Sequence, residues 1–195
     1  QGGRSDVLSH PSHIYARMGR LEDAINALDR LEVQEGKMSQ LSNEKFNLYM
    51  QMGDSVSAFA EIQSLCDEYP ADLYHRVNMG SYYLQLGNFE KALEIYEQVR
   101  QEDPKNIPLQ MAMLDYYLMQ GMDSLYEVTR DSILYAPNTE TEKRVLLIQQ
   151  MIQRMSSDSV EIDRITERFE RVASIDSANV ELLSMYAAFL DYTKR

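Results

Sequence analysis

The sequence has few of the residues on which metal sites, disulfide frameworks and phosphate-binding loops depend. Its 195 residues include one cysteine, Cys66, and no tryptophan. A single cysteine excludes an internal disulfide and a cysteine-rich metal site. The eight glycines are scattered, which excludes a glycine-rich loop around a phosphate. No segment approaches the ~18 consecutive apolar residues of a membrane-spanning helix, so we expect no membrane insertion within this chain.

Positive charge is also scarce. The chain has 19 Lys and Arg residues against 31 Asp and Glu residues, and its formal net charge is −12. An acidic surface repels phosphate backbones, and the basic residues do not cluster, so we expect no nucleic-acid partner. Hydrophobic residues make up 44% of the chain, a normal share for a globular protein. The sequence therefore predicts a soluble folded protein of bacterial composition, in either the cytoplasm or the periplasm.

What the chain does contain is a repeat. An interval of 34 residues separates the members of three series: Tyr15, Tyr49, Tyr83 and Tyr117; Gly19, Gly53, Gly87 and Gly121; and Ala24, Ala58 and Ala92. Recurrence of several residue types at one fixed interval indicates a repeat architecture.

Each interval has the pattern of two helices. In residues 73–106, Gly80 and Tyr83 lie on one stripe of a first helix. Gly87 is placed to end that helix in the left-handed conformation, and Asn88 to cap the second helix. Pro104 ends the second helix, because proline disfavours a helical residue before it. Two such helices form a hairpin, which buries its apolar faces by stacking on neighbouring hairpins.

This order of residues resembles the tetratricopeptide repeat family. The residues that carry the resemblance in the best unit are Gly80, Tyr83, Gly87, Phe89, Ala92, Tyr96 and Pro104. The usual Trp and Leu are replaced by Arg76 and Met79, and Phe46 stands where a small residue is usual. The resemblance implies an all-α fold, a right-handed superhelical stack of about five and a half antiparallel helical hairpins. It also implies a non-enzymatic scaffold that binds a protein or peptide in a concave groove lined by the first helices.

We expect one solenoid domain that follows a disordered tail at residues 1–4. Its units are repeat 1 at 5–38, repeat 2 at 39–72, repeat 3 at 73–106, repeat 4 at 107–138 with a one-residue slip, and a degenerate repeat 5 at 139–179. In repeat 5, Thr139 with Glu142 and Asp158 with Glu161 are the expected capping boxes of its two helices.

The sequence of residues 180–195 predicts the first helix of a further hairpin without the second helix. This helix is apolar on more than one side. The last helix of a repeat array normally shows a polar outer face. Two explanations remain open: the array continues in a longer parent protein, or a second copy of the chain covers this helix in a homodimer.

Residues with catalytic or metal-binding chemistry are few and dispersed. His10 and His13 could share a helix face, but no third ligand is evident, and Ser9 or His10 is expected to cap the helix start. His75 is expected to be exposed, and Cys66 is expected to pack in the core. We therefore expect no metal, no cofactor and no enzyme; catalysis would require a group of residues that are distant in the sequence.

The expected binding surface is the stripe of each first helix that faces away from its partner helix. Its members are Asn43, Asn47, Tyr74, Val77, Asn78, Ser81, Gln85, Met111, Asp115 and Met119. Some family members hold an acidic C-terminal tail with Lys, Arg and Asn, but Arg17 is the only cation available here. The amides and flexible apolar side chains instead favour an extended or helical peptide. The alternative is an architectural or regulatory segment of a larger protein, with no ligand of its own.

Overall fold

The computed structural model describes residues 11–155 and 158–194, and all regular secondary structure in those ranges is α-helical. The chain divides into two compact units, here termed unit 1, which ends at Pro104, and unit 2, which begins at Lys105. The helices of unit 1 are α1 (Pro11–Arg17), α2 (Leu21–Glu35), α3 (Ser39–Gln51), α4 (Ser55–Glu68), α5 (Leu73–Gln85) and α6 (Phe89–Glu102). The helices of unit 2 are α7 (Ile107–Met119), α8 (Asp123–Tyr135), α9 (Thr141–Arg154), α10 (Ser159–Ile175) and α11 (Val180–Thr193).

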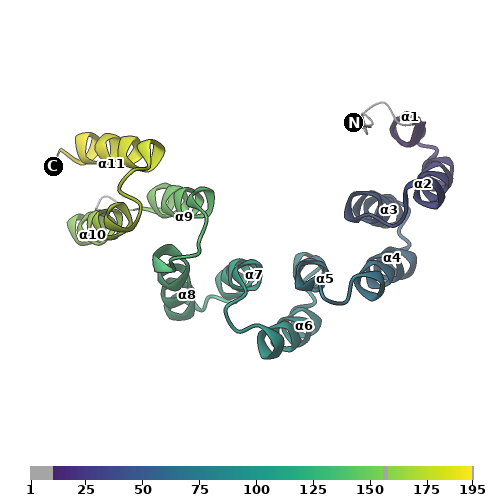
Figure 1. Ribbon diagram of the computed structural model, residues 1–195, viewed down its shortest axis with the longest axis horizontal. Helices are drawn as coiled ribbons and strands as arrows, with labels where there is room; N and C mark the ends of the chain where they lie inside the picture. The colour runs from purple at the N-terminus through teal and green to yellow at the C-terminus, as the bar shows by residue number, and fades with distance from the viewer. Residues whose placement is uncertain (1–10, 156–157, 195) are drawn as a thin grey trace. The chain divides into compact units, whose positions relative to one another are not determined.

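Unit 1 is a row of three helical hairpins. Helix α1 packs on α2, α3 on α4 and α5 on α6, and contacts of α2 with α3 and of α4 with α5 join the hairpins. Within this unit α1, α3 and α5 lie on one side of the row, and α2, α4 and α6 lie on the other (Figure 1). The all-α fold of helical hairpins that the sequence predicts is confirmed.

One repeated backbone turn closes the hairpins. The N–H of the residue after each turn glycine donates to the carbonyl of a tyrosine five residues earlier, at 2.8–2.9 Å; these tyrosines are Tyr15, Tyr49, Tyr83 and Tyr117. The four turn glycines have φ between +66° and +77°, a region that favours glycine. Tyrosine and glycine therefore recur every 34 residues because the same turn geometry recurs at that interval.

Short polar side chains start the second helices of unit 1. The Asp54 carboxylate accepts from the Ser57 N–H at 3.0 Å at the start of α4, and the Asn88 amide oxygen accepts from the Lys91 N–H at 3.2 Å at the start of α6. Each cap satisfies a backbone donor that has no partner within its own helix. The predicted role of Asn88 as an N-cap is confirmed.

Unit 2 departs from a simple row of hairpins. Helix α7 packs on α8, whereas α10 contacts α8, α9 and α11. The core around α10 consists of side chains with no exposed surface, namely Leu147, Ile148, Phe169, Val172 and Leu182. This core lets α10 fix the positions of three other helices of unit 2.

The start of α9 differs from the sequence prediction. The helix begins at Thr141 after Glu140, with no side-chain cap bond. The buried Thr139 hydroxyl instead donates to the Ile133 carbonyl at 2.7 Å and satisfies an acceptor near the end of α8. The predicted capping box of Thr139 and Glu142 is therefore wrong, because a bond to the preceding helix replaces it. Asp158 does cap α10, through a bond from the Val160 N–H at 3.2 Å.

A buried arginine holds the same corner of unit 2. The Arg144 guanidinium on α9 donates to the Leu134 carbonyl at 3.1 Å and to the Ala136 carbonyl at 2.7 Å. It also lies 3.8 Å from the Asp176 carboxylate, which follows α10. One side chain thus joins the ends of α8 and α10 to the start of α9, and its charge is matched by acceptors that would otherwise lack partners.

The last helix, α11, buries one face and exposes another. Leu182 and Phe189 are buried in the core of unit 2, while Val180, Leu183 and Tyr192 are exposed. No helix within residues 11–155 and 158–194 has the length and apolar character needed to cross a lipid bilayer.

Candidate functional site

The residues expected to form the binding surface of unit 1 lie on α3 and α5. Asn47, Tyr74 and Gln85 are exposed, and Asn43, Asn78 and Ser81 are partly buried; these six residues are here termed the first-helix face of unit 1. Val77 was expected on the same surface, but its side chain is only 3% exposed. That expectation is wrong, because Val77 packs inside the unit and offers a partner no surface.

An aromatic contact fixes the two helices of this face relative to each other. The Phe46 ring on α3 stacks on the Tyr82 ring on α5, with 3.9 Å between the ring centroids. The Tyr82 hydroxyl donates to the Asn43 amide oxygen at 3.1 Å. These contacts explain why a phenylalanine replaces the small residue at position 46. They also hold the Asn43 amide in one orientation, with its N–H groups still available as donors.

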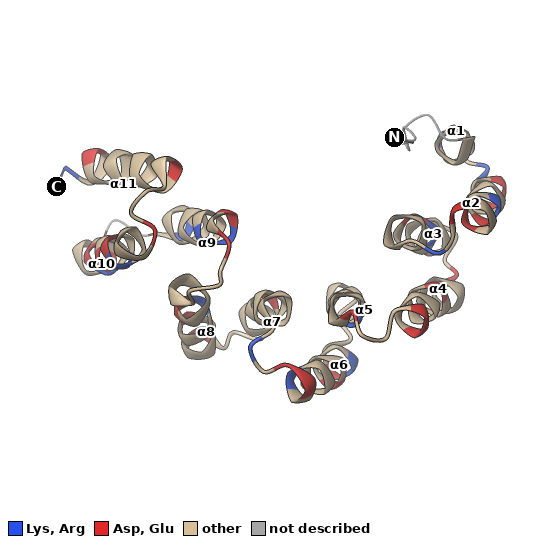
Figure 2. Ribbon diagram, viewed as in Figure 1, with Lys and Arg blue, Asp and Glu red and all other residues tan. Residues whose placement is uncertain are grey.

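The first-helix face is nearly free of charge, in contrast to the opposite side of unit 1. Figure 2 shows α3 and α5 mostly tan, whereas the acidic segments lie mainly on α2, α4 and α6. The arginine of α5, Arg76, forms two hydrogen bonds with the Glu102 carboxylate, at 2.5 and 2.6 Å. The Ser81 hydroxyl is already bonded within the fold, because it donates to the Val77 carbonyl at 3.1 Å and lies 3.1 Å from the Tyr96 hydroxyl. The rest of the face offers a partner uncharged donors, uncharged acceptors and the exposed ring of Tyr74.

The lysine of α3 is buried in an ion cluster that the sequence did not reveal. The Lys45 ammonium lies 2.8 Å from the Asp29 carboxylate and 3.4 Å from the Glu61 carboxylate, and it also bonds Glu32. Burial acts to lower the pKa of Lys45, but the bonds to the carboxylates outweigh it and raise that pKa. Lys45 thus stays charged and ties α3 to α2 and α4.

A second lysine shares two of these carboxylates. Lys37 lies 3.1 Å from Glu32 and 2.8 Å from Glu61, and the Ser42 hydroxyl donates to Glu61 at 2.7 Å. Burial acts to raise the pKa of Glu32, but hydrogen bonds from Lys45 and Lys37 outweigh it and lower that pKa. The cluster joins the first two hairpins and is a structural feature, because its cations are occupied within the fold.

The expected surface residues of unit 2 lie on α7. Met111 is partly buried against the core of the unit, while Asp115 and Met119 are exposed. Although the Asp115 residue is exposed, its carboxyl group is partly desolvated by the surrounding protein, and this raises its pKa. These three residues belong to a different compact unit from the first-helix face of unit 1.

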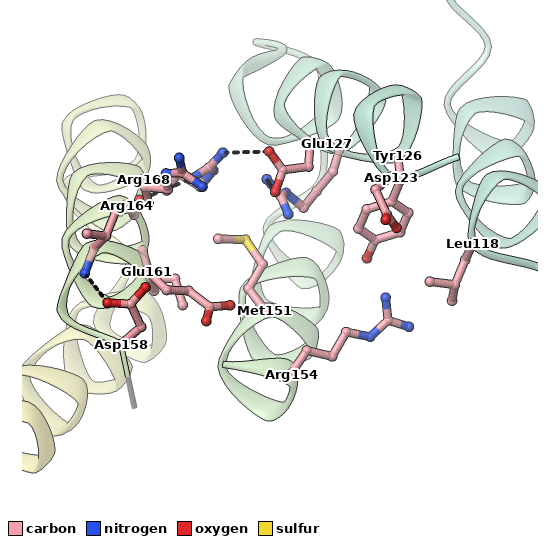
Figure 3. Close-up of a pocket in the computed structure, with 13 residues that line it drawn as sticks. Leu118, Asp123, Tyr126, Glu127, Met151, Arg154, Asp158, Glu161, Arg164 and Arg168 are labelled. Carbon is pink, nitrogen blue, oxygen red and sulfur yellow. Dashed lines mark hydrogen bonds and ion pairs between the residues drawn. The ribbon is translucent and has the colours of Figure 1, made fainter. Parts of the chain in front are cut away.

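Unit 2 also contains a pocket of about 430 Å³ that sequence reasoning missed. It lies among the end of α7, the first part of α8, the end of α9 and the first part of α10 (Figure 3). Tyr126, Met151 and Ile165 are its buried apolar residues. Asp123, Arg154, Asp158, Glu161 and Arg164 bring charges of both signs to it. No sequence motif pointed to this pocket, because its residues come from four helices.

Ion pairs occupy the wall of the pocket. The Arg168 guanidinium lies 4.0 Å from the Glu127 carboxylate (Figure 3). It also makes two bonds of 3.0 Å to the carboxylate of Asp131, which is not one of the lining residues. Arg130 lies 3.0 Å from Asp131 and 4.0 Å from Glu127. Arg154 lies over the Tyr126 ring, 5.4 Å from its centroid. Four acidic side chains and four arginines line the pocket, so its wall is balanced in charge.

Two residues with catalytic chemistry belong to unit 1 and do not line this pocket. His75 was expected to be exposed, but it is buried, 3.5 Å from the Asp72 carboxylate and in ring contact with Tyr69 and Tyr74. Cys66 is buried as predicted, and burial raises the pKa of its thiol, which disfavours the reactive thiolate.

The expected histidine pair near the start of the chain lies only partly within the described residues. His10, Ser9 and the tail at 1–4 lie outside the described residues. His13 lies 3.8 Å from the Glu44 carboxylate. Within residues 11–155 and 158–194, no group of three His, Cys, Asp or Glu side chains is arranged to hold a metal ion.

Known proteins match the chain in sequence and in fold. A family model described as tetratricopeptide repeat matches residues 77–106. Cellulose synthase operon protein C of Xanthomonas axonopodis pv. citri (strain 306) is 27% identical over 92 residues, which are 43% of this chain and 6% of that protein. The chain thus spans only a small part of the length of this curated relative.

Two solved bacterial structures are similar in fold. A thermophilic tetratricopeptide repeat protein of Thermus thermophilus has a TM-score of 0.52 and 16% identity, over 92% of this chain and 95% of that chain. A tetratricopeptide repeat protein of Parabacteroides merdae has a TM-score of 0.48 and 17% identity, over 98% of this chain and 86% of that chain. The Thermus structure supports the same fold, and the family match falls in the unit whose residues carry the resemblance most fully.

Proposed function

Because the chain is a tetratricopeptide repeat protein, we propose that it is a non-enzymatic scaffold that binds a peptide or protein partner on its first helices. Proteins of this family generally mediate protein interactions through the extended surfaces of their stacked hairpins. The observation that carries the proposal is the first-helix face of unit 1. Its polar groups are uncharged, several are exposed, and the Phe46–Tyr82 stack holds the two helices that present them.

The chemistry of this face favours a peptide segment. The amides of Asn47, Asn78 and Gln85 can donate to and accept from a peptide backbone. The half-exposed Tyr74 ring supplies a rigid apolar anchor of the kind that contributes most to binding. No lysine or arginine among the six residues of the face can hold a carboxylate-rich tail, so the proposed partner is not selected by negative charge.

A peptide-library selection on the purified chain tests this proposal. Enriched peptides are then measured against the wild type and against Asn47→Ala and Tyr74→Ala variants. Loss of the tyrosine anchor is expected to weaken binding about tenfold, the equivalent of about 1.4 kcal/mol. Val33→Ala, at an exposed position of α2, is the matched control and should bind like the wild type. Peptides that bind all variants equally would contradict the proposal.

The alternative is an architectural or regulatory segment without a ligand of its own. One observation favours it: the matched region is 6% of the length of the Xanthomonas relative, so similar hairpins can form a small part of a much larger protein. A purified chain that enriches no peptide in the selection, while remaining folded, would support this alternative over the scaffold.

The third class, an enzyme, has less support. The described lining of the unit 2 pocket contains no histidine, cysteine, serine or lysine. Its groups capable of acid–base chemistry are Tyr126 and four carboxylates, which share the lining with four arginines. Buried His75 and Cys66 lie in unit 1 and do not line that pocket.

We also propose that the chain binds a second copy of itself. Val180, Leu183 and Tyr192 of α11 are exposed on a helix whose opposite face is buried. Exposed apolar residues grouped on one helix are typical of a contact surface. We place a homodimer contact at residues 180–195.

A further inference from the structure

The hairpin turns of unit 1 form one edge of the unit, and this edge carries apolar residues that are exposed to solvent. Met18, Met52 and Leu86 each directly precede a turn glycine, and they are 62%, 39% and 52% exposed. Isolated exposed apolar residues are common. Here the same position of three successive turns is apolar and exposed, and the corresponding residue of unit 2, Gln120, is polar.

The repeated turn geometry gives these side chains a common arrangement. The turns at Gly19, Gly53 and Gly87 share the same backbone hydrogen bond and φ values between +74° and +77°. Equal backbone conformations direct the preceding side chain the same way at each turn. The three side chains therefore occupy equivalent positions at successive hairpin turns of unit 1.

A hollow of about 300 Å³ lies on this edge between the first two turns. Gly19, Leu21, Glu22, Asp23 and Met52 line it, together with Arg20. The Arg20 guanidinium is bonded to Asp23 at 2.7 Å and lies over the Tyr15 ring. Glu22 is exposed at the start of α2. The hollow thus combines an apolar wall with a carboxylate that a partner can reach.

We propose that the turn edge of unit 1 is a docking surface for an extended basic segment of another protein. A lysine or arginine of that segment enters the hollow, with its aliphatic stem against Leu21 and Met52 and its charge near Glu22. Apolar side chains of the same segment cover Met52 and Leu86.

Charge decides between this occupant and a second copy of the chain. A second copy that packed by the same edge would bring its own Glu22 to an edge that already presents this carboxylate. A basic segment is attracted to the same edge and relieves the repulsion. This surface is separate from the first-helix face, and the inference does not depend on the proposed function.

The test uses a fluorescent peptide of repeated Lys-Leu-Ser triplets and its Glu-Leu-Ser counterpart, measured by anisotropy against the full chain. The lysine peptide is expected to bind, and Met52→Ser, Leu86→Ser and Glu22→Lys are each expected to weaken it about tenfold. Matched controls lie at the other end of α2, where Val33→Ser and Glu35→Lys should bind like the wild type.

Two results would overturn the inference. One is the absence of binding by the lysine peptide at low salt. The other is an equal loss with Glu35→Lys and Glu22→Lys and no loss with Met52→Ser, which would show non-specific attraction to an acidic protein. Tyr74→Ala should leave this binding unchanged, so the result is independent of the first-helix face. Circular dichroism of each variant confirms that the helices remain folded.

Discussion

The Tyr96 ring on α6 packs directly against Gly80 on α5 and fills the space that a larger side chain at position 80 would occupy. A Cβ atom placed on Gly80 would lie 2.5 Å from Cε1 of Tyr96, whose side chain is fully buried. The Tyr96 hydroxyl also lies 3.1 Å from the Ser81 hydroxyl, within hydrogen-bonding distance. The hydroxyl contact and the buried surroundings leave the ring little room to move, and the glycine is therefore required for close packing of α5 on α6.

This relationship predicts that Gly80→Ala destabilises the protein. Although alanine favours a helix over glycine, overpacking against the tyrosine ring should outweigh that gain and cost about 1–3 kcal/mol. Chemical denaturation measures the change. Gln85→Ala on the same helix is the exposed control. Tyr96→Leu introduced into the Gly80→Ala chain should recover part of the lost stability. If the stability change of the double variant equals the sum of the two single changes, the two residues do not interact and the prediction is wrong.

The buried Lys45 cluster predicts a second stability effect. Lys45→Met removes the ammonium and leaves the Glu32 and Glu61 carboxylates with fewer partners in a buried site. The expected cost is about 3 kcal/mol, at the low end for a buried ion pair that loses one member. Lys91→Met, at an exposed position of α6, should change stability by less than about 0.5 kcal/mol. Equal denaturation midpoints for the two variants would rule out the structural role of the cluster.

Glu32 makes the stability of unit 1 depend on pH. Its pKa in the folded protein is below the ordinary value of 4.5, so the unfolded chain binds more protons in the interval between the two values. The resulting stabilisation is present above pH 4.5 and is lost as the pH falls through the lower folded pKa. Glu32→Gln should therefore lose less stability on acidification than the wild type, while Glu35→Gln should follow the wild type. Parallel pH profiles for wild type and Glu32→Gln would contradict this.

The exposed side chains of α11 predict self-association. Light scattering at several protein concentrations should give the mass of a dimer, and Leu183→Glu should convert it to a monomer. Phe189 is unsuitable for this test, because it is buried and packs against the Phe169 ring. A monomer mass for the wild type at every concentration would exclude the homodimer.

The sequence predicted the hairpins because their turns are local. The tyrosine carbonyl, the turn glycine and the N-cap at Asn88 act within a few residues of one another, so a fixed interval reveals them. Predictions failed where a distant group decided the outcome. Thr139 bonds the end of the preceding helix, and His75 is buried beside the rings of Tyr69 and Tyr74.

The ion clusters could not be predicted from the sequence for the same reason. Lys45 pairs with carboxylates from two other helices, and Arg168 of α10, which lines the unit 2 pocket, pairs with Glu127 and Asp131 of α8. No spacing along one helix marks these partners. The exposed Met and Leu residues before the turn glycines, in contrast, follow the 34-residue interval and are visible in the sequence.

The most direct test of the account is a nitrogen–proton correlation spectrum of the labelled chain, recorded while a library-selected peptide is added. The side-chain amide signals of Asn43, Asn47, Asn78 and Gln85 report on the first-helix face of unit 1. We expect these signals to shift together and to saturate with the peptide, while the Gln34 amide on α2 stays unchanged. Saturable binding that leaves all four amide signals in place would show that the first-helix face is not the binding site.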